Sequence, residues 1–320
     1  MAPRRPRPSR GRAARLAPVL DRFQRGFDAE ARLSADPVEF PRRYRDPGDA
    51  EVAGLVAACL AYGRADVFKA KVEQVLAAGG PSPAAFAARL ARHPDPRVLA
   101  GFRYRINTGE DLAALLAAAG WMRAGSGSLG ARFAWLIGEA AAAEAPVRTA
   151  LSRFADELRT APPALTILRE RGGKGLRHLC PDPGAGGAAK RWNLYLRWMV
   201  RGPDGVDLGI WPDVPPAALV VPLDTHVARV ARRLGLTRRK DLSWRTAEEI
   251  TAALRVADPD DPVRFDFALC HLGMSGHCPP RRVPERCAIC KLVEGCEAGA
   301  VSGPASRAGP GTRSARAGRS

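Results

Sequence analysis

The stretch VVPLDTHVARV, residues 220–230, marks the beginning of a helix. After it, Val227, Val230 and Leu234 recur at the spacing of a single apolar helix face. Asp224 therefore stands where the helix begins, and a carboxylate there has two readings. It is either a plain N-cap, worth about 1 kcal/mol, or the working carboxylate of an active site.

Helical spacing of apolar residues continues through most of the chain, and no alternating pattern of useful length predicts a strand. The sequence therefore predicts an all-α fold. The Gly- and Pro-rich stretch 201–216 is the best candidate for an interdomain connection. We accordingly expect a helical barrel domain over residues 50–202 and a second helical lobe built from 20–49 together with 217–297.

Both ends of the chain are rich in Gly, Pro, Ser, Ala and Arg, so residues 1–19 and 298–320 are predicted to be disordered. Residues 1–16 carry six arginines and residues 299–320 carry four, with no acidic residue in either. Subtracting these ten from the net charge of +17 leaves +7 on the body. A basic body favours a polyanionic partner such as nucleic acid. The alternative explanation of the positive charge is a coding bias towards arginine, because only six residues are lysine.

The chain contains no run of eighteen apolar residues, so no membrane span is expected. No apolar segment follows the basic N-terminus, which argues against a secretory signal. We therefore expect a cytoplasmic monomer. In a reducing compartment its cysteines are thiols or metal ligands rather than disulfides.

Four of the seven cysteines lie within nineteen residues, in the spacing C-x8-C-x2-C-x5-C. Four thiolates so close together predict a metal centre, either a four-iron four-sulfur cluster or zinc. The alternative is a chance clustering of free thiols. Cys59 and Cys270 lie on apolar helix faces and are predicted to be core thiols. The predicted ligands are Cys278, Cys287, Cys290 and Cys296.

The helix-opening aspartate and the cysteine loop, in a basic helical chain, together resemble the helix-hairpin-helix DNA glycosylase superfamily, in particular endonuclease III and the adenine glycosylase. Those enzymes carry a V-D-T-H-x-x-R-V segment and a C-x6-C-x2-C-x5-C loop that holds a four-iron cluster. The loop here has two extra residues, and the shared x2 and x5 spacings favour iron over zinc. The matching positions of the first segment are Asp224, Thr225, His226, Arg229 and Val230.

A closer resemblance covers residues 20–275, which are similar to an uncharacterised bacterial family assigned to this superfamily. It rests on pieces such as KRWNLYLRWMVRGPDGVDLGIW, PLDTHVARVARRLGL and DPDDPVRFDFALCHLGM. The superfamily hairpin, L-P-G-V-G-x-K-T-A, is not matched by GAGGAAKRWNL at 184–194. That stretch keeps glycines, a lysine and the start of a helix.

The resemblance implies a two-lobed fold with a C-terminal four-Cys cluster loop, and duplex DNA across the cleft with a base flipped out. Asp224 is then the catalytic carboxylate, which stabilises positive charge on the sugar. Lys190 is the candidate nucleophile, because a lysine whose pKa is lowered by burial or nearby cations forms a Schiff base and arginine does not. The alternative is that Lys190 contacts a phosphate or is an ordinary surface lysine.

The expected function is a base-excision repair glycosylase, with or without AP-lyase activity, associated with the nucleoid. Two alternatives remain: a non-catalytic DNA- or RNA-binding protein that keeps the fold, and a zinc-stabilised interaction module. Arg64 stands in the place of the glutamine that endonuclease III inserts into DNA. The predicted DNA-contacting residues are Arg64, Arg191, His226, Arg281, Arg282 and Arg286.

Overall fold

The structure is a computed structural model that describes residues 10–169 and 173–297. The described chain is mostly helical, which confirms the predicted helical class. The α-helices are α1 (Arg10–Arg25), α2 (Glu30–Leu33), α3 (Pro47–Leu60), α4 (Ala65–Gly79), α5 (Pro83–Arg92), α6 (Gly109–Ser126), α7 (Leu129–Glu139), α8 (Pro146–Thr160), α9 (Pro162–Ile167), α10 (Lys174–Leu179), α11 (Lys190–Val200), α12 (Thr225–Arg233), α13 (Trp244–Ala257), α14 (Asp266–Met274) and α15 (Pro284–Ala288).

Short 3-10 turns connect several of these helices. They are η1 (Pro37–Glu39), η2 (Pro41–Arg43), η3 (Pro183–Ala185), η4 (Pro216–Ala218) and η5 (Val293–Gly295). One antiparallel hairpin, β1 (Arg103–Tyr104) and β2 (Asn107–Thr108), was not predicted. Strands this short show no period-2 pattern, so the sequence carries no signal for them.

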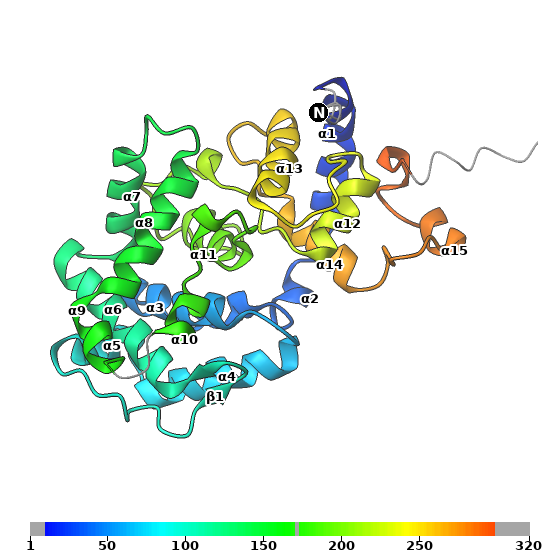
Figure 1. The fold of residues 1–320 in the computed structure, drawn as a ribbon. Coiled ribbons are helices and arrows are strands. Elements are labelled where there is room, and N and C mark those ends of the chain that lie inside the picture. Colours follow the sequence, from blue (N-terminus) through cyan, green and yellow to red (C-terminus); the bar gives the residue numbers. More distant parts are fainter. Residues whose placement is uncertain (1–9, 170–172, 298–320) are drawn as a thin grey trace, which may run out of the picture.

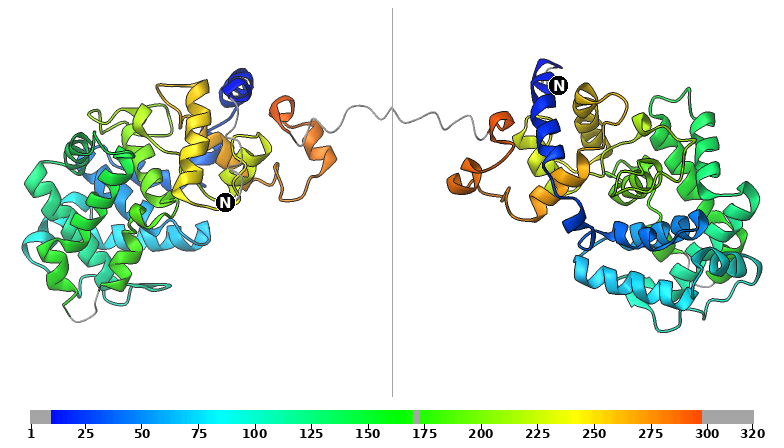
Figure 2. Two further views of the ribbon diagram at one scale, coloured as in Figure 1. Left: turned by 45° about the horizontal axis from the view of Figure 1, so that its top comes forward. Right: turned by 180° about the vertical axis from the view of Figure 1, so that it is seen from behind.

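Figures 1 and 2 show α4 to α9 gathered on one side of the molecule and α1, α12, α13 and α14 on the other. Helix α3 packs against α4, α5, α6 and α11, and α12 packs against α14. Nearly every side chain of α3 is buried. This explains why the sequence of α3 has apolar residues on every face of the helix. Among the described residues, no helix is long and apolar enough to cross a membrane.

The predicted disorder of residues 1–19 is wrong for residues 10–19, which form most of α1. Leu16, Leu20 and Phe23 are buried at helical spacing, and α1 packs against α13. A prediction from composition missed this apolar stripe, because the segment also contains many arginines. Residues 1–9 and the predicted C-terminal tail, 298–320, lie outside the described residues.

Contacts from α1 hold two other parts of the chain together. Arg12 Nε donates to the carbonyl of Leu234 at 2.8 Å, and Arg12 Nη2 donates to the carbonyl of Gly295 at 2.9 Å. The backbone N–H of Glu297 donates to the carbonyl of Arg233 at 2.8 Å. The first described helix therefore ties the end of α12 to the end of the cysteine segment.

The predicted connection over 201–216 is not an exposed linker. Asp207 and Trp211 are buried, and Trp211 Nε1 donates to Glu51 Oε1 on α3 at 2.8 Å. The Gly and Pro content correctly indicated an irregular segment, but its apolar and charged residues pack it against the helices on both sides.

Candidate active site

Asp224 is the N-cap of α12. Its Oδ1 accepts hydrogen bonds from the backbone N–H groups of His226 and Val227, each at 2.8 Å. Two of the N–H groups that a helix leaves unpaired at its start are thereby satisfied. The capping role uses only one carboxylate oxygen, so Oδ2 is left for another partner.

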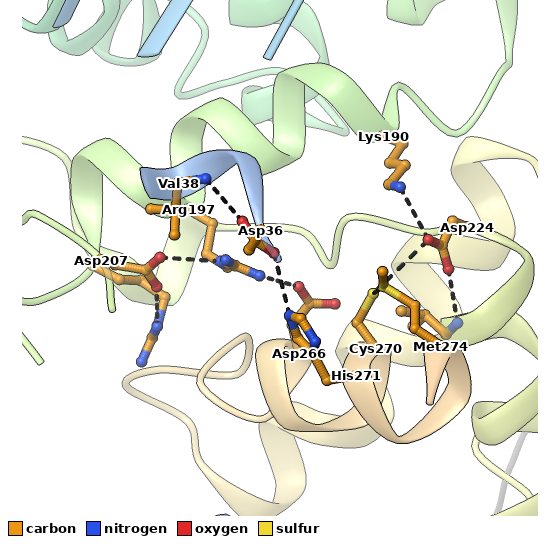
Figure 3. Close-up of polar contacts among 12 residues, drawn as sticks. Asp36, Val38, Lys190, Arg197, Asp207, Asp224, Asp266, Cys270, His271 and Met274 are labelled. Atoms are coloured by element: carbon orange, nitrogen blue, oxygen red, sulfur yellow. Dashed lines mark hydrogen bonds and ion pairs between the residues drawn. The ribbon is translucent and has the colours of Figure 1, made fainter. Parts of the chain in front are cut away.

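That partner is Lys190, whose Nζ lies 3.0 Å from Asp224 Oδ2 (Figure 3). Lys190 is the first residue of α11, and it follows Ala189, which has a left-handed backbone with φ of 48°. A non-glycine residue in this conformation is uncommon and recurs at functional sites. The structure therefore brings together the two predicted catalytic side chains, from α11 and from the start of α12.

The pair is reachable from solvent: the Lys190 side chain is 37% exposed and that of Asp224 is 13% exposed. Burial disfavours the charged form of Asp224, but the Lys190 ammonium and the N–H of Val227 outweigh it and lower the pKa of Asp224. Burial likewise favours a neutral Lys190, but the Asp224 carboxylate outweighs it and raises the pKa of Lys190. The expectation of a lowered lysine pKa is therefore wrong for this state, in which the two groups form an ion pair.

Cys270, on α14, completes the surroundings of the carboxylate. Its Sγ lies 3.9 Å from Asp224 Oδ2 and 3.7 Å from Met274 Sδ. Burial, and then the charge of Asp224, raise the pKa of Cys270, so it is a thiol that donates to Oδ2. The sequence reading placed Cys270 in the core and missed this contact. The sequence shows only that Asp266, Cys270 and Met274, spaced four residues apart, lie along one face of α14.

A buried charge network lies beside the pair (Figure 3). Arg197, whose side chain is 2% exposed, contacts Asp266 at 2.6 Å and Asp207 at 3.2 Å. His271 Nε2 lies 3.5 Å from Asp36 Oδ2 in the same region. Burial raises the pKa of Asp266 to about 6, with Arg197 acting in the opposite direction and Asp224 adding to the rise. None of these residues was predicted from the sequence to belong to the site.

Two of the predicted DNA contacts have different surroundings. Arg64, before α4, is 79% exposed and pairs with Asp66 at 2.7 Å. Arg191 instead points into the protein: its Nη1 donates to the carbonyl of Cys59 at 2.6 Å, and its Nη2 donates to the carbonyl of His178. Arg64 therefore lies at the surface in an ion pair, whereas Arg191 ties α11 to α3 and α10.

The other predicted DNA contacts lie near α12 and the cysteine segment. His226 Nδ1 is 3.2 Å from Arg229 Nη2. Arg281 and Arg282 are exposed, and Arg286 donates to the carbonyl of Gly276 at 2.6 Å. These four residues stay predictions as contacts to DNA.

The four clustered cysteines occupy a segment that contains α15 and η5. Burial raises the pKa of Cys290, and the nearby thiols of Cys278, Cys296 and Cys287 add to the rise. Arg233 Nη1 also donates to Cys278 Sγ at 3.2 Å.

The four cysteines of this segment are residues that can hold an iron–sulfur cluster as thiolates. The Arg233 guanidinium would stabilise the negative charge of such a cluster. Within 10–169 and 173–297, however, no three Cys, His, Asp or Glu side chains converge closely enough to hold a metal ion. The iron–sulfur and zinc alternatives both stay predictions.

A family model described as "Protein of unknown function (DUF2400)" matches residues 36–275. The match includes Lys190 and Asp224 and ends before the four clustered cysteines. No curated protein and no solved structure matches the chain.

Proposed function

The chain belongs to the DUF2400 family, and from the geometry of its site we propose that it is a DNA N-glycosylase that removes a flipped base. The observation that carries this proposal is the Lys190–Asp224 pair, 3.0 Å from Nζ to Oδ2, at the start of α12. The reaction needs a partly exposed carboxylate that can stabilise positive charge, and the lysine ammonium beside it fixes that carboxylate in position. The two-lobed helix-hairpin-helix arrangement, with DNA between the lobes, belongs to the same proposal.

In the proposed reaction, the bond between the base and C1′ of the sugar breaks with its electron pair going to the base, which takes up a proton from solvent. Positive charge develops on the sugar until water bonds to C1′. Asp224 stabilises that charge and accepts a proton from the attacking water. Because Oδ1 is fixed by two backbone N–H groups, Oδ2 is the oxygen that faces the reaction. Lys190 holds Oδ2 in place, and its charge attracts the neighbouring phosphate of the strand.

The proposal predicts that the purified protein releases at least one base from duplexes that each carry a single modified or mismatched base. The measurement is strand cleavage at the resulting abasic site by a separate endonuclease. Failure to release a base from any duplex in a broad panel would overturn the enzymatic proposal.

Lys190→Ala is expected to excise the base about tenfold more slowly than the native protein. Borohydride is expected to trap no covalent adduct with DNA in the native protein or in the variant. The reason is that Asp224 raises the pKa of Lys190, so the resting lysine is an ammonium and water attacks instead. Lys174→Ala is the matched control, since Lys174 is an exposed lysine at the start of α10. A trapped adduct in the native protein that is lost only in Lys190→Ala would instead make Lys190 the nucleophile of a glycosylase with lyase activity.

A second candidate function is DNA or RNA binding without catalysis. It is favoured by the same ion pair, because a lysine and an aspartate that neutralise each other also serve as a fixed structural contact. The lesion panel separates the two candidates, since a binding protein retains affinity for the duplexes but releases no base.

We also propose that the cysteine segment holds a four-iron cluster, which when bound would fix the exposed arginines of that segment towards DNA phosphates. Protein purified without oxygen is expected to be brown and to contain about four irons per chain. Cys290→Ala should lose the iron, whereas Cys59→Ala should keep it, because Cys59 is buried at the end of α3. Stoichiometric zinc without iron would contradict the cluster and favour the zinc alternative.

A further inference from the structure

Asn107, in β2, is fully buried and organises a polar cluster on α10 and the loop after α3. Its Nδ2 donates to the carbonyl of Gly175 at 2.8 Å, which fixes the orientation of the amide. Its Oδ1 then faces two other groups: the hydroxyl of Tyr62 at 2.7 Å and Nδ1 of His178 at 3.0 Å.

This arrangement fixes the tautomer of His178. An amide oxygen only accepts hydrogen bonds, so Nδ1 of His178 must carry a proton. Burial, and then the charge of Arg191, lower the pKa of His178, so the ring is neutral at neutral pH. In a neutral ring protonated on Nδ1, Nε2 is an acceptor with a lone pair.

The Nε2 atom of His178 faces solvent. The residue is only partly buried, and the described protein supplies no hydrogen-bond partner to Nε2. Nor is Nε2 among the buried side-chain atoms that lack a partner. Nε2 is therefore an acceptor that is accessible to solvent and has no partner in the described protein, on a ring that Asn107 holds through Nδ1.

The backbone of His178 is linked to the helix turn that carries Lys190. Arg191 follows Lys190 in the first turn of α11, and its Nη2 donates to the carbonyl of His178. The Arg191 guanidinium also lies 5.2 Å from the centre of the Tyr62 ring. His178 packs edge-on against Tyr62, with ring centres 4.7 Å apart. Only one arginine side chain therefore separates the His178 backbone from the turn that carries Lys190.

Tyr62 is poorly suited to stack on a base itself. Its ring already packs against Tyr104, with centres 4.6 Å apart, as well as against His178 and the Arg191 guanidinium. Its hydroxyl donates to Asn107. In this cluster, the outward-facing group with unused hydrogen-bonding capacity is Nε2 of His178.

We propose that His178 Nε2 accepts a hydrogen bond from an N–H group on the edge of the extruded base. The inference rests on the proposed glycosylase function and specifies its substrate class: a base with an imide or exocyclic amine N–H at that edge. A base that is methylated at an imide nitrogen, or doubly methylated at an exocyclic amine, lacks the donor and leaves Nε2 unpaired.

The first test does not require catalysis. Long-range proton–nitrogen NMR of the imidazole rings should show one histidine with a protonated Nδ1 and an unprotonated Nε2 that is absent from His178→Asn. Free uracil should shift that Nε2 resonance, whereas 1,3-dimethyluracil, which has no N–H, should not. An Nε2-protonated ring, or equal shifts with both compounds, would overturn the inference even if base excision is observed.

The second test compares two substitutions of His178 on the preferred lesion and its N-methylated analogue. The Asn side chain reproduces the Nδ1 donor to Asn107 and lacks the distal acceptor, whereas Gln supplies an amide near the Nε2 position. His178→Asn should lower the kcat/KM ratio of lesion to analogue by roughly tenfold, the effect of one neutral hydrogen bond, and His178→Gln should restore part of it. His93→Asn, at an exposed histidine on the C-terminal side of α5, is the matched control.

The outcomes separate this inference from the function on which it rests. If the lesion is excised and His178→Asn keeps the native ratio, the inference fails and the glycosylase proposal stands. If no base is excised, the glycosylase proposal fails, while the NMR titration still decides whether Nε2 accepts from a base.

Discussion

Asp224→Asn is expected to lower base excision by about 10²–10³-fold, the range measured when a group that stabilises developing charge is removed. The protein should keep its DNA affinity and lose no more than about 1 kcal/mol of stability. Excision is measured on the preferred lesion, and stability by thermal unfolding.

The contrast follows from the different tasks of the two carboxylate oxygens. Asn ranks with Asp as an N-cap, so its side-chain oxygen can still accept from the N–H groups of His226 and Val227. The second position becomes an uncharged NH₂ group that faces the Lys190 ammonium. The negative charge at Oδ2 is lost, and the start of α12 is retained.

Asp46→Asn is the matched control, because Asp46 also caps a helix: it accepts from the N–H of Asp49 at 2.9 Å at the start of α3. It should change neither excision nor binding. Native excision by Asp224→Asn would show that Asp224 is only a cap and would end the catalytic proposal.

Arg197→Met is expected to lower the free energy of unfolding by about 3–5 kcal/mol, the usual effect of removing one partner from a buried ion pair. Arg197 contacts Asp266 at 2.6 Å and Asp207 at 3.2 Å, and all three side chains are almost fully buried. Met fills most of the volume, so the loss reports Asp266 left without its cation and Asp207 left with Arg201 alone. Urea unfolding measures the change.

Arg97→Met tests the same substitution in an exposed pair, where Arg97 contacts Asp95 at 3.3 Å. Exposed pairs contribute about 0–1 kcal/mol, so little change is expected. If Arg197→Met is as stable as Arg97→Met, the buried network is not required for the fold.

The sequence identified the start of α12 because capping has a local signature. An acceptor residue stands before an apolar stripe, and both lie within a few residues of each other. The same reasoning placed Lys190 at the start of a helix. The sequence could not show that the two side chains meet, because that contact depends on how α11 packs relative to α12.

The buried position of Arg197 was also beyond local reasoning. In KRWNLYLRWMV an arginine inside a helix normally marks the solvent face, yet α11 is buried almost all round. Charged residues are rarely buried unless they are paired, and the partners, Asp207 and Asp266, lie on other elements. Cys270 escaped notice for a related reason, since an apolar helix face does not show which of its residues borders an ion pair.

The position of α1 has a consequence for how the chain is synthesised. This helix leaves the ribosome well before its packing partners, because it packs against α13 and η5, and α13 begins only at Trp244. During the intervening synthesis, on the order of tens of seconds, its apolar stripe has no partner. We therefore expect α1 to stay undocked on the nascent chain until α13 has been made, and so to be among the last of the described helices to join the fold.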